Sequence, residues 1–234
     1  MPYAVITGAT QGIGRAIAEK LLQEGFSVAI CARNSDDLHA LQLEWQRRWP
    51  DAAIICHPAD FLRKEDVAAF ADTVLAAFPQ TDILVNNAGI FIPGRLADEA
   101  EGHLEMLMSV NMFSAYHLTR KLLPQMKAAG SGHIFNMCSV ASLKSYPNGG
   151  SYSITKYALL GFSENLREEL IPFNIKVTAI CPGATNSRSW TGSGIPAERI
   201  MEPGDVANML LASWTLSAQA DVETIVMRPL KGDL

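Results

Sequence analysis

Two side chains with complementary acid–base chemistry lie four residues apart in this chain. Tyr152 and Lys156 fall in a stretch, 151–171, whose apolar pattern predicts a helix, so both side chains project from one helix face. A phenol titrates at about 10 in water, but an ammonium group held beside it favours the phenolate, and we expect the pKa of Tyr152 to fall toward neutrality. A tyrosine of this kind can exchange a proton with a substrate oxygen.

Two further polar residues precede this pair. Ser139 lies 13 residues before Tyr152, just past a predicted strand at 133–138, and Asn111 interrupts an otherwise apolar helical stretch over 103–128. A tyrosine and a lysine at this spacing occur by chance in many chains, so the pair carries weight only with these companions. A serine hydroxyl near the tyrosine would hydrogen-bond the substrate oxygen to which Tyr152 transfers its proton.

A glycine-rich turn lies between a predicted strand at 3–6 and a predicted helix at 13–24. Its sequence is Thr7-Gly8-Ala9-Thr10-Gln11-Gly12-Ile13-Gly14. Glycines at this place let the backbone approach a pyrophosphate, which the free N–H groups of the helix N-terminus attract. The strand before the turn and the helix after it favour a dinucleotide site over a simple tight turn.

The residues that end the second predicted strand indicate which dinucleotide binds. Sites of this kind use an Asp or Glu for the ribose of NAD and an Arg for the 2′-phosphate of NADP. Here the sequence is Ala32-Arg33-Asn34. Ala32 does not repel a phosphate and Arg33 offers a planar set of donors, so NADP is the predicted cofactor. An ordinary solvated Arg33 is the alternative.

These residues must be positioned by an alternation of short apolar segments with longer helical patterns. The predicted strands lie at 3–6, 27–32, 52–56, 82–85, 133–138, 175–181 and 223–227, and the helices at 13–24, 36–48, 64–77, 103–128, 151–171 and 204–217. Every crossover holds a helix, as parallel strands require. We expect an α/β fold: a single Rossmann-type doubly wound domain over 1–234, with a seven-stranded parallel sheet flanked by helices on both faces. The one long stretch without periodicity, at about 184–201, predicts a substrate lid with Gly192 and Gly194 as hinges.

The motifs resemble those of the short-chain dehydrogenase/reductase family. The family's features are T-G-x-x-x-G-x-G, here at 7–14, N-N-A-G, here at 86–89, and a catalytic tetrad that Asn111, Ser139, Tyr152 and Lys156 match in order and spacing. The resemblance covers essentially the whole chain. It implies that Lys156 holds the nicotinamide ribose and that Asn111 anchors a water molecule linking Lys156 to solvent. An oxidised nicotinamide bound there would, like Lys156, favour the phenolate of Tyr152 and lower its pKa.

The resemblance also implies further cofactor contacts. Asp60 matches the residue that hydrogen-bonds the adenine amino group, with a helix cap as its alternative role. Pro182 and Gly183 match a turn under the nicotinamide, with Thr185 beside it. The whole predicted cofactor site is Thr7, Gly8, Thr10, Gln11, Gly12, Ile13, Gly14, Arg33, Asn34, Asp60, Asn87, Ala88, Gly89, Tyr152, Lys156, Pro182, Gly183 and Thr185.

Together these features predict an NADP(H)-dependent oxidoreductase, a carbonyl reductase or alcohol dehydrogenase that interconverts a carbonyl and a secondary alcohol by hydride transfer. The alternative is a catalytically silent NADP-binding sensor or scaffold, against which the intact tetrad argues. Phe91, Ile92, Tyr146, Trp190 and Met201 lie on segments expected around the nicotinamide and favour a largely apolar or planar substrate, with support of the core as their alternative role. The tail at 228–234 is similar to that of some sepiapterin-reductase-like members, which adds a pteridine or diketone as a candidate.

Composition excludes several classes of partner. The net charge is −5 and no basic run is longer than Arg47-Arg48, so no nucleic acid is expected. The four cysteines are widely spaced without a metal-binding pattern, which predicts free thiols in a reducing compartment and no metal. Neither an N-terminal signal peptide nor a membrane span is expected from the sequence pattern. We expect a cytoplasmic protein that acts on a small carbonyl or alcohol substrate.

Two helical stretches predict self-association. Residues 103–123 carry apolar side chains around the whole helical wheel, whereas a helix packed on a sheet needs only one apolar face. The stretch 151–171 is similarly rich in apolar residues and is expected to lie beside it. Relatives in the family pair these two helices with their counterparts in a second subunit. A homodimer is therefore predicted, with a homotetramer left open and coverage by loops of the same chain as the alternative.

Overall fold

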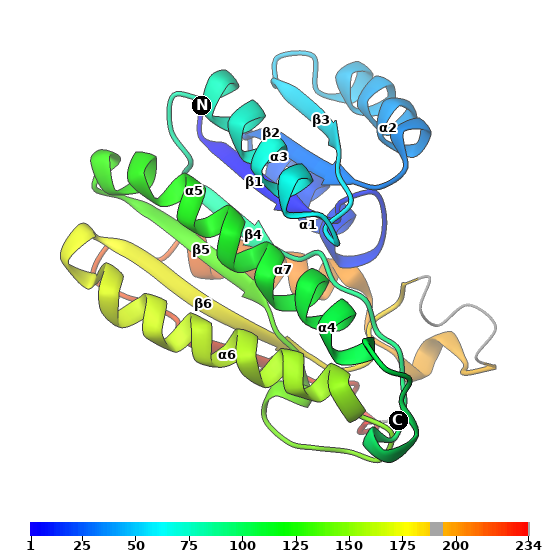
Figure 1. Ribbon diagram of the computed structural model, residues 1–234. Helices are drawn as coiled ribbons and strands as arrows, with labels where there is room; N and C mark the ends of the chain where they lie inside the picture. Colours follow the sequence, from blue (N-terminus) through cyan, green and yellow to red (C-terminus); the bar gives the residue numbers. More distant parts are fainter. Residues whose placement is uncertain (188–193, 234) are drawn as a thin grey trace.

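A parallel sheet forms the centre of the computed structural model, which describes residues 1–187 and 194–233 (Figure 1). The strand order is β3-β2-β1-β4-β5-β6-β7, and every neighbouring pair is parallel. The strands are β1 (Tyr3–Thr7), β2 (Ser27–Ala32), β3 (Ile54–Pro58), β4 (Ile83–Asn86), β5 (Gly132–Met137), β6 (Ile175–Pro182) and β7 (Thr224–Met227). The predicted seven-stranded doubly wound sheet is confirmed.

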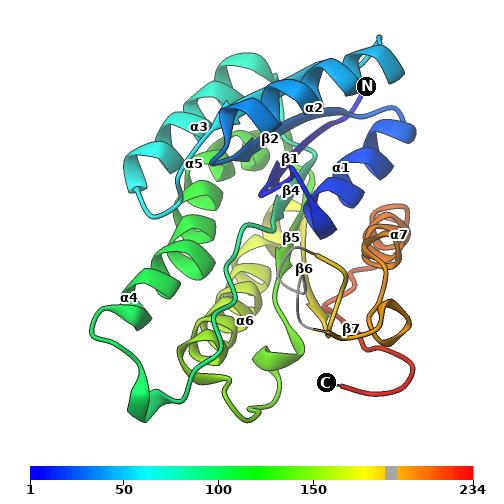
Figure 2. The same cartoon turned by 90° about the vertical axis from the view of Figure 1, so that its right-hand side faces the viewer.

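Helices cover both faces of this sheet. They are α1 (Gly12–Gln23), α2 (Ser35–Arg48), α3 (Lys64–Ala77), α4 (His103–Met108), α5 (Ser114–Ala129), α6 (Gly150–Leu170) and α7 (Pro203–Trp214). Short 3-10 helices are η1 (Leu96–Asp98), η3 (Val140–Ser142), η4 (Ile171–Phe173) and η6 (Ala197–Arg199). Figure 2 shows α1 and α7 on one side of the sheet and α3, α4, α5 and α6 on the other.

Each face has its own apolar core, because the buried strands carry apolar side chains in both directions. Ile17 of α1, Trp45 of α2 and Leu210 of α7 pack on one face. Phe70 of α3 and Leu118 of α5 belong to the core of the other face. These two cores hold the strands in place, and the strands in turn anchor the loops at their carboxyl ends.

The strand order places a crevice between β1 and β4. From β1 the chain proceeds through β2 to β3 on one side, and it then returns to β4 on the other side of β1. The loops that leave β1 and β4 therefore diverge, and in open α/β sheets ligands bind at this switch point. The glycine-rich turn follows β1 and the N-N-A-G sequence follows β4, so both lie at the crevice.

Two differences from the sequence prediction have a clear physical cause. The helix expected over 103–128 is interrupted by a π-helical turn, η2 (Ser109–Phe113), where the Ser114 N–H donates to the carbonyl of Ser109, five residues earlier. The third strand is Ile54–Pro58 rather than 52–56. Because β3 pairs only with β2, it is an edge strand, and an edge strand tolerates a proline.

The described part of the chain gives three further observations. None of its helices is long and apolar enough to cross a membrane. Across residues 1–187 and 194–233, no group of three or more His, Cys, Asp or Glu side chains is arranged to hold a metal ion. All four cysteines are free thiols.

Candidate active site

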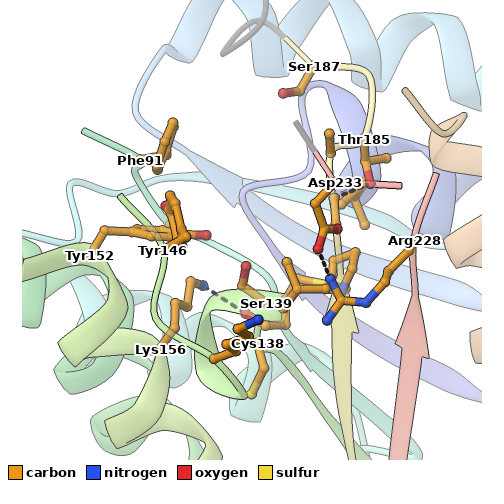
Figure 3. Close-up of a pocket in the computed structure, with 18 of the residues that line it drawn as sticks. Phe91, Cys138, Ser139, Tyr146, Tyr152, Lys156, Thr185, Ser187, Arg228 and Asp233 are labelled. Atoms are coloured by element: carbon orange, nitrogen blue, oxygen red, sulfur yellow. Dashed lines mark hydrogen bonds and ion pairs between the residues drawn. The ribbon is translucent and has the colours of Figure 1, made fainter. Parts of the chain in front are cut away.

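A cavity of about 530 Å³ opens at the carboxyl edge of the sheet. Its lining includes three predicted catalytic residues, Ser139, Tyr152 and Lys156. Figure 3 shows Tyr152 and Lys156 reaching the cavity from α6, while Ser139 follows β5. The lining also contains these predicted cofactor residues: Ile13, Asn87, Gly89, Pro182, Gly183 and Thr185.

The glycine-rich turn leaves the N-terminus of α1 open. Gly8 and Gly12 have φ values of +65° and +55°, which favour glycine. A Cβ atom on Gly14 would overlap the carbonyl oxygen of Gly8, so the helix can pack this closely on the turn only with glycine there. Gln11 precedes α1 without a side-chain cap, which leaves the first N–H groups of the helix available to an anion.

Thr7 and Asn87 join this turn to the loop after β4. The Thr7 hydroxyl oxygen accepts hydrogen bonds from the N–H groups of Asn87 and Ala88, both at 2.9 Å. The Asn87 side chain donates to the carbonyl oxygens of Thr7 and Gly8 at 2.9 and 3.0 Å. Both side chains therefore fix the shape of the crevice, and their predicted contact with a cofactor stays a prediction.

Asn111 lies behind the cavity at the π-helical turn and is 1% exposed. Its side-chain oxygen accepts from the Ile90 N–H at 2.8 Å, and its amide nitrogen donates to the Ile90 carbonyl and to the Thr155 hydroxyl, both at 3.0 Å. The Thr155 hydroxyl in turn donates to the carbonyl of Tyr152 at 2.8 Å. Asn111 thus connects the loop after β4 to α6, which carries Tyr152 and Lys156.

Ser139 and Lys156 are each held by the chain around them. The Ser139 N–H donates to the Ser142 hydroxyl, and the Ser139 hydroxyl oxygen accepts from the Ala141 N–H, both at 3.1 Å. The Lys156 ammonium is buried and donates to the Met137 carbonyl at 2.8 Å. Burial lowers the pKa of Lys156.

The protonation of Tyr152 differs from the sequence prediction. Burial raises the pKa of Tyr152 to about 12, and a hydrogen bond with Ser139 opposes that rise only in part. The Lys156 ammonium lies 5.7 Å from the centroid of the tyrosine ring. In the chain without cofactor this pKa is therefore raised rather than lowered, because loss of hydration disfavours the phenolate. The lowering expected from Lys156 together with a bound oxidised nicotinamide stays a prediction.

The residues predicted to select the cofactor lie after β2 and β3. Arg33 is exposed, and no hydrogen bond or ion pair within residues 1–187 and 194–233 involves its guanidinium. Asn34 caps α2 by accepting from the N–H groups of Asp36 and Asp37 at 2.9 and 3.1 Å. Asp60 accepts from the Leu62 N–H at 3.1 Å. Asn34 and Asp60 thus have local structural roles, and their cofactor contacts stay predictions.

The loop after β6 forms another wall of the cavity. Thr185 is buried, donates to the Gly183 carbonyl at 3.0 Å and forms a parallel bridge with Met201. This bridge joins the two ends of the predicted lid. Residues 188–193, with the predicted hinge Gly192 and the aromatic Trp190, lie outside the described residues, so the lid stays a prediction. Of the other predicted substrate contacts, Phe91 and Tyr146 line the cavity.

Comparison with known proteins agrees with this geometry. The family description for short chain dehydrogenases matches residues 2–194. This chain belongs to the short-chain dehydrogenase family.

Among the relatives of this short-chain dehydrogenase is an uncharacterized oxidoreductase of Staphylococcus aureus, 30% identical over 228 residues, which are 97% of this chain and 96% of the relative. An alcohol dehydrogenase from the archaeon Thermococcus sibiricus, complexed with 5-hydroxy-NADP, has a TM-score of 0.90 at 29% identity and covers 98% of this chain and 97% of its own. The L-sorbose reductase of Gluconobacter frateurii, complexed with NADPH and L-sorbose, also has a TM-score of 0.90 at 28% identity, with coverages of 97% and 95%.

Several residues that shape the site were missed from the sequence. Thr155 lies between Tyr152 and Lys156, where a threonine in a helix gives no signal. Ser142 stands three residues after Ser139, and that spacing is a capping pattern that was open to recognition. Glu99 accepts hydrogen bonds from the N–H and hydroxyl of Ser151 at the start of α6, although it lies 52 residues away, and no sequence pattern announces such a contact.

Proposed function

We propose that this short-chain dehydrogenase interconverts a carbonyl and a secondary alcohol by hydride transfer with NADP(H). The observation that carries the proposal is the meeting of two hydroxyl groups, on Ser139 and Tyr152, at one cavity with the Lys156 ammonium beside them. This arrangement argues against a catalytically silent sensor or scaffold, because binding of the cofactor alone does not require two hydroxyl groups that face an open cavity.

Tyr152 is the proton donor in the reductive direction. Because its pKa is raised to about 12, the phenol keeps its proton at neutral pH. The Ser139 hydroxyl, fixed by the turn at η3, binds the same carbonyl oxygen. When bound, the cofactor supplies a hydride to the carbonyl carbon.

Lys156 and Asn111 support this step. The lysine ammonium has three N–H bonds, of which the Met137 carbonyl takes one in the described residues. The others are available to the hydroxyls of a nicotinamide ribose. Asn111 is a positioning residue, because it touches Ile90 and Thr155 rather than the reacting atoms. The water molecule that family resemblance places beside Asn111 remains a proposal.

Residues along the crevice suit NADP(H). The open N-terminus of α1 and the close packing at Gly14 suit a pyrophosphate. The exposed guanidinium of Arg33 at the end of β2 suits a 2′-phosphate. The structural neighbours from Thermococcus sibiricus and Gluconobacter frateurii, solved with 5-hydroxy-NADP and NADPH, support this choice of cofactor. The pteridine and diketone candidates stay predictions.

We also propose that the enzyme is a cytoplasmic homodimer. The four free thiols are consistent with a reducing compartment. Apolar side chains on η2 and α6 are exposed, with Phe113 at 45%, Ile154 at 41% and Tyr157 at 43%. Covering them with a second copy of the chain would remove apolar surface from water, and a tetramer stays open.

The test is turnover of a panel of aldehydes and ketones, followed by the loss of reduced-nicotinamide absorbance. Wild-type protein should consume NADPH with at least one carbonyl compound. Tyr152→Phe should lose most of kcat and still bind NADPH, because the ring still packs against Phe91, whose centroid is 4.9 Å away. Equal turnover by the variant would assign the proton to another group. Tight NADPH binding without any turnover would favour the sensor.

A further inference from the structure

The C-terminal turn, defined here as residues 228–233, is built into the wall of the catalytic cavity. The Gly232 N–H donates to the Pro229 carbonyl at 2.9 Å and closes the turn. Arg199 of η6 donates to the Lys231 carbonyl at 3.1 Å and holds the turn from outside. Arg228 and Asp233, at its two ends, both line the cavity. The turn therefore presents two charged side chains to any substrate held at Ser139 and Tyr152.

Arg228 and Asp233 form an ion pair with each other at this wall (Figure 3). The pair engages one terminal nitrogen, Nη1, of the guanidinium. Within the described residues, no hydrogen bond or ion pair uses Nε or Nη2 of Arg228. The Arg228 side chain is 38% exposed and that of Asp233 is 52% exposed. Asp233 thus orients the guanidinium and leaves a second edge with two parallel N–H donors free.

The charges that the described residues bring to the cavity are predominantly positive. Among residues 1–187 and 194–233, the charged lining residues are Lys144, Lys156 and Arg228 against Asp233. Lys156 donates to the Met137 carbonyl, but within residues 1–187 and 194–233 the ammonium of Lys144 has no ion-pair partner. Lys144 comes from the loop after η3, so it reaches the cavity independently of the C-terminal turn. An anionic group entering the cavity meets one oriented guanidinium and one unpaired ammonium.

We infer that the substrate is a carbonyl compound that carries a carboxylate, and that Arg228 binds this carboxylate. The inference rests on the proposed reductase function and names its substrate class. A guanidinium edge with two parallel N–H donors matches the two oxygens of a carboxylate. Asp233 is a positioning residue, since it acts through Arg228. The apolar side chains of Phe91 and Ile90 line the same cavity and suit the carbon skeleton between the two polar groups.

Binding of unreactive probes tests the carboxylate site without turnover. Benzoate and benzamide have similar shapes but differ in charge, and their affinities for NADPH-loaded protein can be compared by calorimetry. Wild type should bind benzoate more tightly. Arg228→Gln should weaken the binding of benzoate roughly tenfold to a hundredfold, as expected for loss of a charge-assisted pair, and should leave the affinity for benzamide unchanged. The benzoate affinity of Arg228→Lys should lie between those of wild type and Arg228→Gln, because an ammonium keeps the charge without the paired donors.

Lys231→Gln is the matched control. Lys231 belongs to the same turn and carries the same charge but does not line the cavity. This variant should bind both probes as wild type does. Equal affinity of wild type for benzoate and benzamide would overturn the inference, as would equal effects of Arg228→Gln and Lys231→Gln on benzoate. Unchanged thermal stability and NADPH affinity in Arg228→Gln exclude a folding defect as the cause of its weaker binding.

Turnover separates this inference from the proposed function. Benzoylformate and its methyl ester present the same ketone with and without a negative charge. Wild type should reduce the acid with the higher kcat/KM, and Arg228→Gln should bring the ratio of the two toward one. Reduction of the ester with rejection of the acid would overturn the carboxylate site and leave the reductase function standing. Benzoate binding that depends on Arg228, with no reduction of any carbonyl compound, would retain the site and refute the function.

Discussion

Asn111 offers a direct test of how the site is held together. Asn111→Leu keeps the size of the side chain but removes every hydrogen bond that it makes. The N–H and carbonyl of Ile90 then lose their partners at 2.8 and 3.0 Å, and the Thr155 hydroxyl loses a donor at 3.0 Å while it still donates to the Tyr152 carbonyl. Because a buried group without a partner costs about 1–3 kcal/mol, and Ile90 is only partly buried, we expect a loss of about 2–4 kcal/mol in the free energy of unfolding.

The measurement is urea unfolding at equilibrium, with a matched control on α6. Asn165 is exposed, and its side chain donates to the Gly161 carbonyl at 2.8 Å, so Asn165→Leu removes a hydrogen bond that water replaces. That variant should lose less than about 0.5 kcal/mol. A loss in Asn111→Leu no larger than that of Asn165→Leu would refute the reasoning, because it would mean that the loop after β4 and α6 are held together without this amide.

Four further predictions follow from the same geometry. Reduction should be constant through neutral pH and decline only at alkaline pH, because the raised pKa of Tyr152 keeps the phenol protonated below it; a rate that rises with pH through neutrality would contradict this assignment. Arg33→Asp should reverse the preference for NADPH over NADH in kcat/KM, and an unchanged ratio would remove Arg33 from the site. Charged substitutions at both Phe113 and Tyr157 should produce a 25.4 kDa monomer in sedimentation, whereas a surviving dimer would place the interface elsewhere. Glu99→Gln should lower the melting temperature near neutral pH, because hydrogen bonds from Ser151 stabilise the charged carboxylate and lower the pKa of Glu99. This stabilising effect is present above the usual glutamate pKa and is lost as the pH falls through the lowered pKa, so the melting temperatures of wild type and variant should converge there.

The order of elements was open to prediction because the physical signals are local. Each buried parallel strand is a short apolar run, and each crossover requires a helix, so the alternation along the chain determines the doubly wound sheet. The glycine-rich turn was also open to prediction, because its glycines stand between a strand pattern and a helical pattern. In the fold, Gly8 and Gly12 adopt positive φ values at this turn, which favour glycine. The cavity then follows from topology, because the divergence of the loops after β1 and β4 is a property of strand order.

The π-helical turn was not visible in the same way. Apolar residues continue on both sides of Ser109–Phe113, so the sequence predicts one uninterrupted helix. The π-helical turn lies where the Asn111 side chain hydrogen-bonds the N–H and the carbonyl of Ile90. Ile90 belongs to a loop 21 residues earlier in the chain, so the helical pattern around Asn111 does not reveal these bonds. The contact of Glu99 with Ser151 and the placement of the C-terminal turn beside Gly183 are of the same kind. Contacts between segments far apart in the chain produce no periodic pattern in the sequence from which they could be predicted.

The pKa of Tyr152 shows most clearly what spacing alone leaves undetermined. From the sequence, Lys156 is a positive charge one helical turn away, and charge alone predicts a phenolate. In the folded chain Lys156 is buried and Tyr152 is half-buried, loss of hydration raises the pKa of the phenol, and the lysine donates to the Met137 carbonyl. The same two residues therefore present a protonated acid at neutral pH. A protonated tyrosine can give its proton to a carbonyl oxygen, so the chain without cofactor already holds the acid that reduction of a carbonyl needs.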